Sequence, residues 1–104
     1  MPESLAATYG LRSITYDNSI MVDICDLQLI GTRLQENGLV ITLSKEYYQQ
    51  ETIDRTRARD VLKVCSIANL VGEEIVKQVL ELGLAKSASV RKISGVPFLM
   101  IYKF

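Results

Sequence analysis

The spacing of apolar residues changes along this chain, and that change constrains the fold more than any other sequence feature. Ile20, Val22 and Ile24 alternate with other residues, as in a β-strand that buries one face. After position 52 the spacing becomes i, i+3, i+4 and i+7, which is the period of an amphipathic helix. The residues of this helical stripe are Ala58, Val61, Leu62 and Cys65. The chain therefore combines strands with helices.

A second helix follows the first. We expect it to begin at Asn69 or Val71, to end near Leu82, and to close in a Schellman motif at Gly83-Leu84. Its predicted buried residues are Ile75, Val76, Val79 and Leu80.

Two strands are expected to close the chain, at residues 90–93 and 98–102, with a turn or bulge at residues 94–97 between them. The last strand is apolar on both faces. This favours a central strand or one that a partner covers.

The N-terminal half carries weaker signals. Residues 11–16 read as a first strand closed by a turn at residues 17–19, and Asn37-Gly38 is a turn dipeptide that precedes a strand at residues 39–43. Asp26 is placed to cap a short helical turn that runs toward Gly31.

These elements predict one compact α+β domain over residues 9–104, after a flexible N-terminal extension of residues 1–8. We expect a mixed or antiparallel sheet of about four to five strands, with two main helices in the middle of the chain. The length of 104 residues suits a single domain.

The composition argues against catalysis. The chain contains no histidine, which removes the commonest general base and the commonest metal ligand. We therefore expect no enzymatic activity, no metal and no cofactor. Cys25 and Cys65 lie in apolar runs far apart in the sequence, which favours buried, reduced thiols, with a bridge between them as the alternative in a hyperthermophile. Neither a signal peptide nor a membrane span is apparent, so we expect a cytoplasmic protein.

The segment Ser66–Glu74 is the strongest candidate for a local site. In one interpretation Asn69 caps the second helix, Gly72 allows another element to pack closely, and Glu73 lies near the positive end of the helix dipole. In the other, Asn69 and Glu73 lie one helical turn apart and bind a ligand together. An enzyme that uses Asp26 with these two residues is the least favoured alternative.

A basic cluster supplies the second candidate site. Arg55, Arg59 and Lys63 fall on one stripe of the first helix, with Arg57 pointing elsewhere, and such a stripe can follow phosphates. Arg91 and Lys92 could extend this patch. Interspersed acidic residues favour instead a solvated face with ion pairs, because the formal net charge of the chain is zero. Tyr47 and Tyr48 offer rings on which bases could stack, or are half-buried anchors.

Several segments together resemble the archaeal family known as domain of unknown function 424. They are Cys25-Asp26 with Leu29-Ile30-Gly31, Ser44–Tyr48 with Glu51, the segment Ser66–Glu74, and Val90–Pro97. The most specific element is Asn-Leu-Val-Gly-Glu at residues 69–73. The chain departs from the family pattern at Phe98-Leu99-Met100, where the family often carries His-Ala-Gln, and this departure favours a structural role for the position or a divergent member of the family.

The resemblance implies an archaeal, thermophilic and cytosolic source and an RNA-binding role. The leading functional prediction is a small non-catalytic protein of translation or RNA metabolism that contacts RNA or a ribonucleoprotein. The predicted phosphate contacts are Arg55, Arg59, Lys63, Arg91 and Lys92. The alternative is a protein-interaction module or homodimer, which the apolar C-terminal strand favours.

Overall fold

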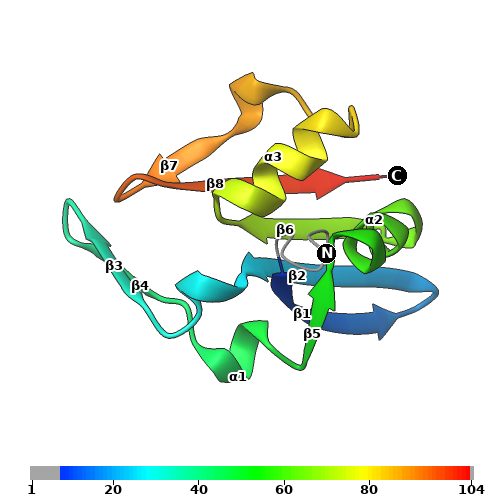
Figure 1. The fold of residues 1–104 in the computed structure, drawn as a ribbon, viewed down its shortest axis with the longest axis horizontal. Coiled ribbons are helices and arrows are strands. Elements are labelled where there is room, and N and C mark those ends of the chain that lie inside the picture. The colour runs from blue at the N-terminus through cyan, green and yellow to red at the C-terminus, as the bar shows by residue number, and fades with distance from the viewer. Residues whose placement is uncertain (1–7, 104) are drawn as a thin grey trace, which may run out of the picture.

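The structure is a computed structural model that describes residues 8–103 (Figure 1). Its main sheet has six strands in the order β5-β1-β2-β6-β8-β7, and a separate two-stranded sheet pairs β3 with β4. The strands of the main sheet are β1 (Thr8–Tyr16), β2 (Ser19–Asp26), β5 (Glu51–Asp54), β6 (Ile67–Val71), β7 (Arg91–Ile93) and β8 (Val96–Tyr102). The small sheet consists of β3 (Arg33–Glu36) and β4 (Leu39–Thr42), and the helices are α1 (Lys45–Tyr48), α2 (Arg55–Val64) and α3 (Glu73–Glu81).

The α+β class and the mixed sheet are confirmed, whereas the expected count of four to five strands is too low. The β2 and β6 strands pair in parallel, and the other neighbours of the main sheet pair antiparallel. Strand β5 was missed because its four residues contain a single buried side chain, Ile53, and so show no alternation. The proposed flexible extension falls on residues 1–7, outside the described part of the chain, and on Thr8, which already begins β1.

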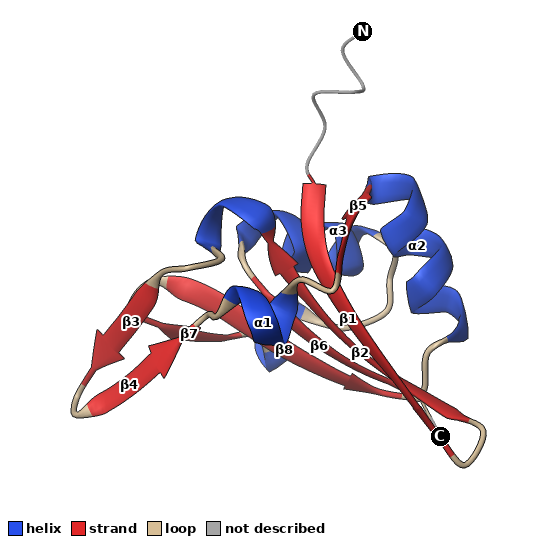
Figure 2. Ribbon diagram, turned by 90° about the horizontal axis from the view of Figure 1, so that it is seen from below, coloured by secondary structure: helices blue, strands red, loops and turns tan. Residues whose placement is uncertain are grey.

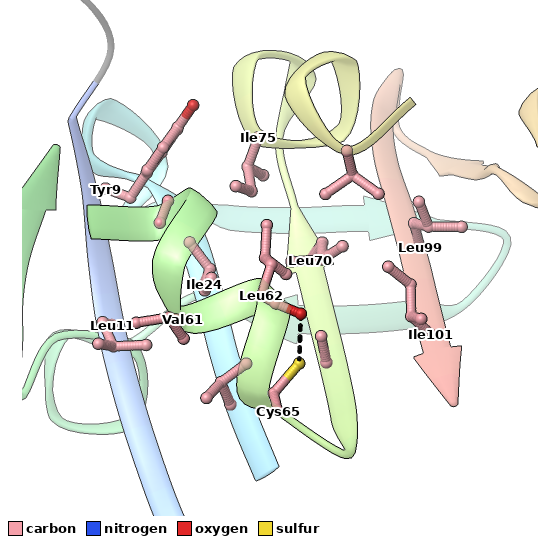
Figure 3. Close-up of a cluster of buried hydrophobic side chains, with 14 of the residues drawn as sticks. Tyr9, Leu11, Ile24, Val61, Leu62, Cys65, Leu70, Ile75, Leu99 and Ile101 are labelled. Atoms are coloured by element: carbon pink, nitrogen blue, oxygen red, sulfur yellow. Dashed lines mark hydrogen bonds between the residues drawn. The ribbon is translucent and has the colours of Figure 1, made fainter. Parts of the chain in front are cut away.

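The helices α2 and α3 cover one face of the main sheet, and the principal core lies between these helices and the sheet (Figures 2 and 3). The predicted stripe of α2 is confirmed, since Ala58, Val61, Leu62 and Cys65 are all buried in this core. From α3, Ile75, Val76 and Val79 are buried and Leu80 packs against them. They meet inward-facing strand residues such as Ile24, Leu70, Leu99 and Ile101.

The predicted end of α3 is confirmed. Gly83 has φ +75°, its N–H donates to the carbonyl of Leu80 at 3.0 Å, and the N–H of Leu84 donates to the carbonyl of Val79 at 3.2 Å. This pair of bonds is the Schellman pattern.

A second, smaller core lies on the other face of the main sheet, at one end. There the β3–β4 hairpin packs Leu34 and Leu43 against Cys25 and Val71. The Asn37-Gly38 turn was predicted, but the strand after it belongs to this hairpin rather than to the main sheet. Ser94 fastens the hairpin to the β7–β8 turn, because its hydroxyl donates to the carbonyl of Gln35 at 2.6 Å.

Both cysteines are free and buried, as the sequence favours. Cys25 lies in the smaller core and Cys65 in the principal core, so the sheet separates the two thiols. Burial raises the pKa of Cys25 to about 12, and it also raises the pKa of Cys65.

Candidate functional site

The face of the main sheet opposite α2 and α3 carries three rows of side chains that run across the strands. The register aligns Cys25, Val71 and Phe98 in the first row, which the β3–β4 hairpin covers. The next row, called the polar row below, consists of Arg12, Asp23, Asn69 and Met100. The third, called the apolar row, consists of Ile14, Met21, Ile67 and Tyr102. The covered end of this face thus adjoins an open end.

Hydrogen bonds link three of the four side chains of the polar row, those of Arg12, Asp23 and Asn69. Asn69 donates from Nδ2 to Oδ1 of Asp23 at 2.9 Å, and Arg12 donates to Oδ2 of the same carboxylate at 3.3 Å. Asp23 is only 7% exposed, so an unpaired carboxylate there would be costly. The amide and the guanidinium therefore satisfy the carboxylate and are held by it.

Helix α1 brings two tyrosines to the edge of the polar row. Ser44 caps this short helix by accepting a hydrogen bond from the Tyr47 N–H at 3.2 Å. The guanidinium carbon of Arg12 lies 4.5 Å from the centroid of the Tyr47 ring, within the range of a cation–π contact. The rings of Tyr47 and Tyr48 meet edge to face with centroids 4.8 Å apart.

The position of α1 depends on Gly10 in β1. A Cβ at this residue would lie 2.7 Å from the carbonyl oxygen of Tyr48, so only glycine admits this approach. Burial, with a smaller contribution from the charge of Asp23, raises the pKa of Tyr48 to about 12. Tyr48 is consequently a neutral, partly buried side chain. Tyr47 is 46% exposed, so its ring is the one that a ligand can reach.

A groove of about 700 Å³ opens between the polar row, α1, the hairpin and β7. Its wall includes Asp23, Leu39, Tyr47, Asn69, Arg91 and Phe98. The volume lies within the usual range for small-ligand sites. With one exposed guanidinium, a fixed amide and aromatic rings, the groove is suited to a flat, polar and anionic ligand.

The predicted basic residues do not come together at this groove. Arg55 pairs with Glu81 and Arg59 with Asp60, each at 3.6 Å, on helices that cover the opposite face of the sheet. Lys63 is exposed in the last turn of α2. Of the two residues from β7, Arg91 lines the groove, whereas Lys92 lines a separate pocket beside α3.

The segment Ser66–Glu74 is a strand followed by a helix, so the expected cap by Asn69 is wrong. Asn69 belongs to β6, and Gly72, with φ +122°, occupies the N-cap position of α3 without a side chain. The carboxylate of Asp26 does the capping instead, accepting hydrogen bonds from the N–H groups of Glu74 and Ile75, both at 2.9 Å. Asp26 therefore does not cap the short helical turn that follows it.

The close approach predicted at Gly72 is confirmed, because an added Cβ would overlap the carboxyl group of Asp26. Glu73 lies in the first turn of α3, as expected. The ligand pair of Asn69 and Glu73 is wrong, since Asn69 lines the groove while Glu73 and Asp26 line a pocket of about 210 Å³ at the start of α3. The three residues of the enzymatic alternative thus do not converge.

Residues 8–103 contain neither a metal-binding cluster nor a membrane-spanning helix. No group of three or more metal-binding side chains clusters in that range. Nor does any helix there have the length and apolar character needed to cross a membrane.

Residues 14–104 match the profile of a family described as Protein of unknown function (DUF424). The chain belongs to this family. The resemblance noted in the sequence is therefore confirmed. No curated protein matches the chain.

A solved structure shares the fold of this DUF424 chain. It is the crystal structure of an uncharacterized conserved protein from the archaeon Methanopyrus kandleri, with a TM-score of 0.76 and 22% sequence identity. The match covers 92% of this chain and 91% of the other. Its archaeal origin agrees with the source that the family implies.

Residues 98–100, where the resemblance to the family breaks off, lie in β8 beside the groove. All three line the groove, and Leu99 is also buried in the principal core. Leu99 therefore belongs to the core as well as to the candidate site.

Sequence reasoning missed Arg12 and Asp23 as site residues. A signal was available for Asp23, because a charged residue between Val22 and Ile24 in an alternating strand must face away from the core. The pairing with Arg12 and Asn69 arises from the register of three strands, which the sequence does not give.

Proposed function

We propose that this protein binds single-stranded RNA across the open face of its main sheet, with the groove as the central contact. The observation that carries the proposal is that Arg91, Asn69 and Tyr47 line a single groove. These residues supply, in order, a cation for phosphate, a hydrogen-bonding amide and an exposed aromatic ring.

Single-stranded RNA is recognised through this combination. Unpaired bases stack on aromatic rings or arginine planes, and cations beside the rings follow the backbone. The open face offers Tyr47 and, in the apolar row, Tyr102, which is 60% exposed. A duplex would present its phosphates without free base faces, so the proposal favours single strands.

The proposed contact surface differs from the basic stripe of α2. Arg55 and Arg59 are engaged in ion pairs on the helical side, and Arg91 alone among the five predicted phosphate contacts lines the groove. With zero formal net charge, binding depends on this local arrangement and should weaken as the salt concentration rises.

The test is fluorescence anisotropy with a labelled single-stranded RNA and a matched duplex over a salt series. The proposal expects binding of the single strand, weaker binding of the duplex, and a linear fall of log affinity with log salt. Absence of binding to the single strand at low salt would refute it.

A second candidate function is self-association or binding of another protein through the apolar row. Ile14 and Met21 are each 37% exposed, which is unusual for an apolar stripe across neighbouring strands. Light scattering during size-exclusion chromatography tests self-association, because a monomer at high concentration rules out the homodimer. In both cases we propose a non-catalytic, cytoplasmic protein.

A further inference from the structure

We infer that the groove holds a purine base by its exocyclic amino group, which donates a hydrogen bond to Oδ1 of Asn69. This inference rests on the proposed RNA binding and specifies which bases the site selects. It depends on the orientation of the Asn69 side-chain amide and on the carboxylate of Asp23, to which that amide is hydrogen-bonded.

The amide orientation follows from chemistry. The carboxylate of Asp23, paired with Arg12, offers only acceptor atoms, so Asn69 must present its nitrogen to it. The 2.9 Å bond from Nδ2 to Asp23 consequently turns Oδ1 of Asn69 away from the carboxylate. Because Arg12 holds the other carboxylate oxygen at 3.3 Å, the carboxylate is restrained from both sides.

The groove wall thus presents the acceptor Oδ1 of Asn69, beside a carboxylate whose charge Arg12 partly offsets. An acceptor receives a hydrogen bond from an amino group and gives none to a carbonyl oxygen. Adenine and guanine each carry an exocyclic amino group, whereas uracil presents a carbonyl on each side of its ring N–H. Hydrogen bonding therefore selects against uracil.

Stacking area then separates purines from cytosine, which also carries an amino group. Phe98 of β8 and Tyr47 of α1 line the groove together with Asn69. Bases stack on aromatic side chains in single-strand sites, and the two-ring purines offer more stacking area than a pyrimidine. The groove should accordingly favour an amino-bearing purine.

The test varies one base of the RNA and then the side chain of Asn69. The probes are uridine oligonucleotides of about ten residues, matching the span of common single-strand sites, with one central base replaced. The replacements are adenine, guanine, cytosine, unsubstituted purine and hypoxanthine. Unsubstituted purine lacks the amino group of adenine, and hypoxanthine lacks that of guanine.

We expect adenine, guanine or both to raise affinity about fivefold over uridine, the effect of one net hydrogen bond. Removing the amino group should abolish this gain, and the pair that shows the loss identifies the base. Asn69→Leu should bind every probe with the same affinity, whatever its central base. A cooperative urea transition of the variant shows that it is folded.

The two proposals fail in different ways. If every probe binds equally well, or if Asn69→Leu keeps the preference, the purine inference is overturned and RNA binding stands. If no probe binds, both fail.

Discussion

The carboxyl group of Asp26 occupies the space beside Gly72 that a side chain would fill, and from there it caps α3. Its two oxygens accept hydrogen bonds from Glu74 and Ile75, each at 2.9 Å. This contact joins the end of β2 to the start of α3 across 48 residues of sequence. The glycine and the first helical turn at the end of the segment Ser66–Glu74 are therefore explained by helix capping at long range.

Gly72→Ala should destabilise the protein by about 3 kcal/mol or more, because it adds backbone strain and displaces the Asp26 carboxylate. Gly95→Ala is the matched control. Gly95 also has positive φ, +79°, but nothing lies within 4 Å of the added Cβ, so only strain of about 1–2 kcal/mol is expected. Urea denaturation measures both variants. Equal losses of stability in the two variants would show that the Asp26 cap does not require the absence of a Cβ at Gly72.

Asp26 should give stability a characteristic pH dependence. Burial raises the pKa of Asp26 above its ordinary value of 3.8, although the two N–H groups oppose the shift. The folded state therefore binds the proton more tightly than the unfolded state. The contribution of the Asp26 proton to the free energy of unfolding is fully present below pH 3.8, the ordinary pKa of the group. It is lost as the pH rises through the raised pKa of the folded state.

The measurement is the free energy of unfolding of the wild type and Asp26→Asn over a pH series. The wild-type value minus the variant value should fall with rising pH within that window and then level off. A difference that rises with pH would mean that the two N–H groups outweigh burial.

The two thiols should be unreactive in the folded protein. Cys25 is fully buried and Cys65 is 4% exposed, and burial raises both pKa values, to about 12 for Cys25. Very little thiolate is present at pH 8, and thiolate is the reactive form. A thiol reagent at that pH should react at the rate at which the protein opens, and quickly in urea. Rapid reaction without denaturant would show that one of the two cores opens frequently and exposes its cysteine to solvent.

The principal core was accessible to sequence reasoning, because its helical part repeats at a regular period. Ala58, Val61 and Leu62 fall on one stripe, and the end of α3 carries a local glycine signal at Gly83. The stripe and the helix end each depend on residues only a few positions apart in the sequence. Such local patterns predict the structure correctly where the tertiary packing favours the same conformation.

The start of α3 and the groove were not accessible, since both depend on distant partners. Residues 67–71 form a short apolar run that fits a strand and a helix equally well, and the cap comes from Asp26. The polar row arises only when β1, β2 and β6 align Arg12, Asp23 and Asn69. A one-residue change of register would turn these side chains into the core.

Neighbouring residues of β7 offer the most direct test that RNA binds on the open face. Arg91 lines the groove and Lys92 lines the pocket on the helical side, so each replacement removes one exposed charge from the same strand. The measurement is the affinity of Arg91→Ala and Lys92→Ala for a single-stranded RNA over a salt series.

Arg91→Ala should lower affinity about tenfold at low salt and reduce the salt slope by about 0.7, as expected for one lost phosphate contact on a single strand. Lys92→Ala should stay close to the wild type. Equal losses in the two variants, or a larger loss in Lys92→Ala, would contradict binding on the open face.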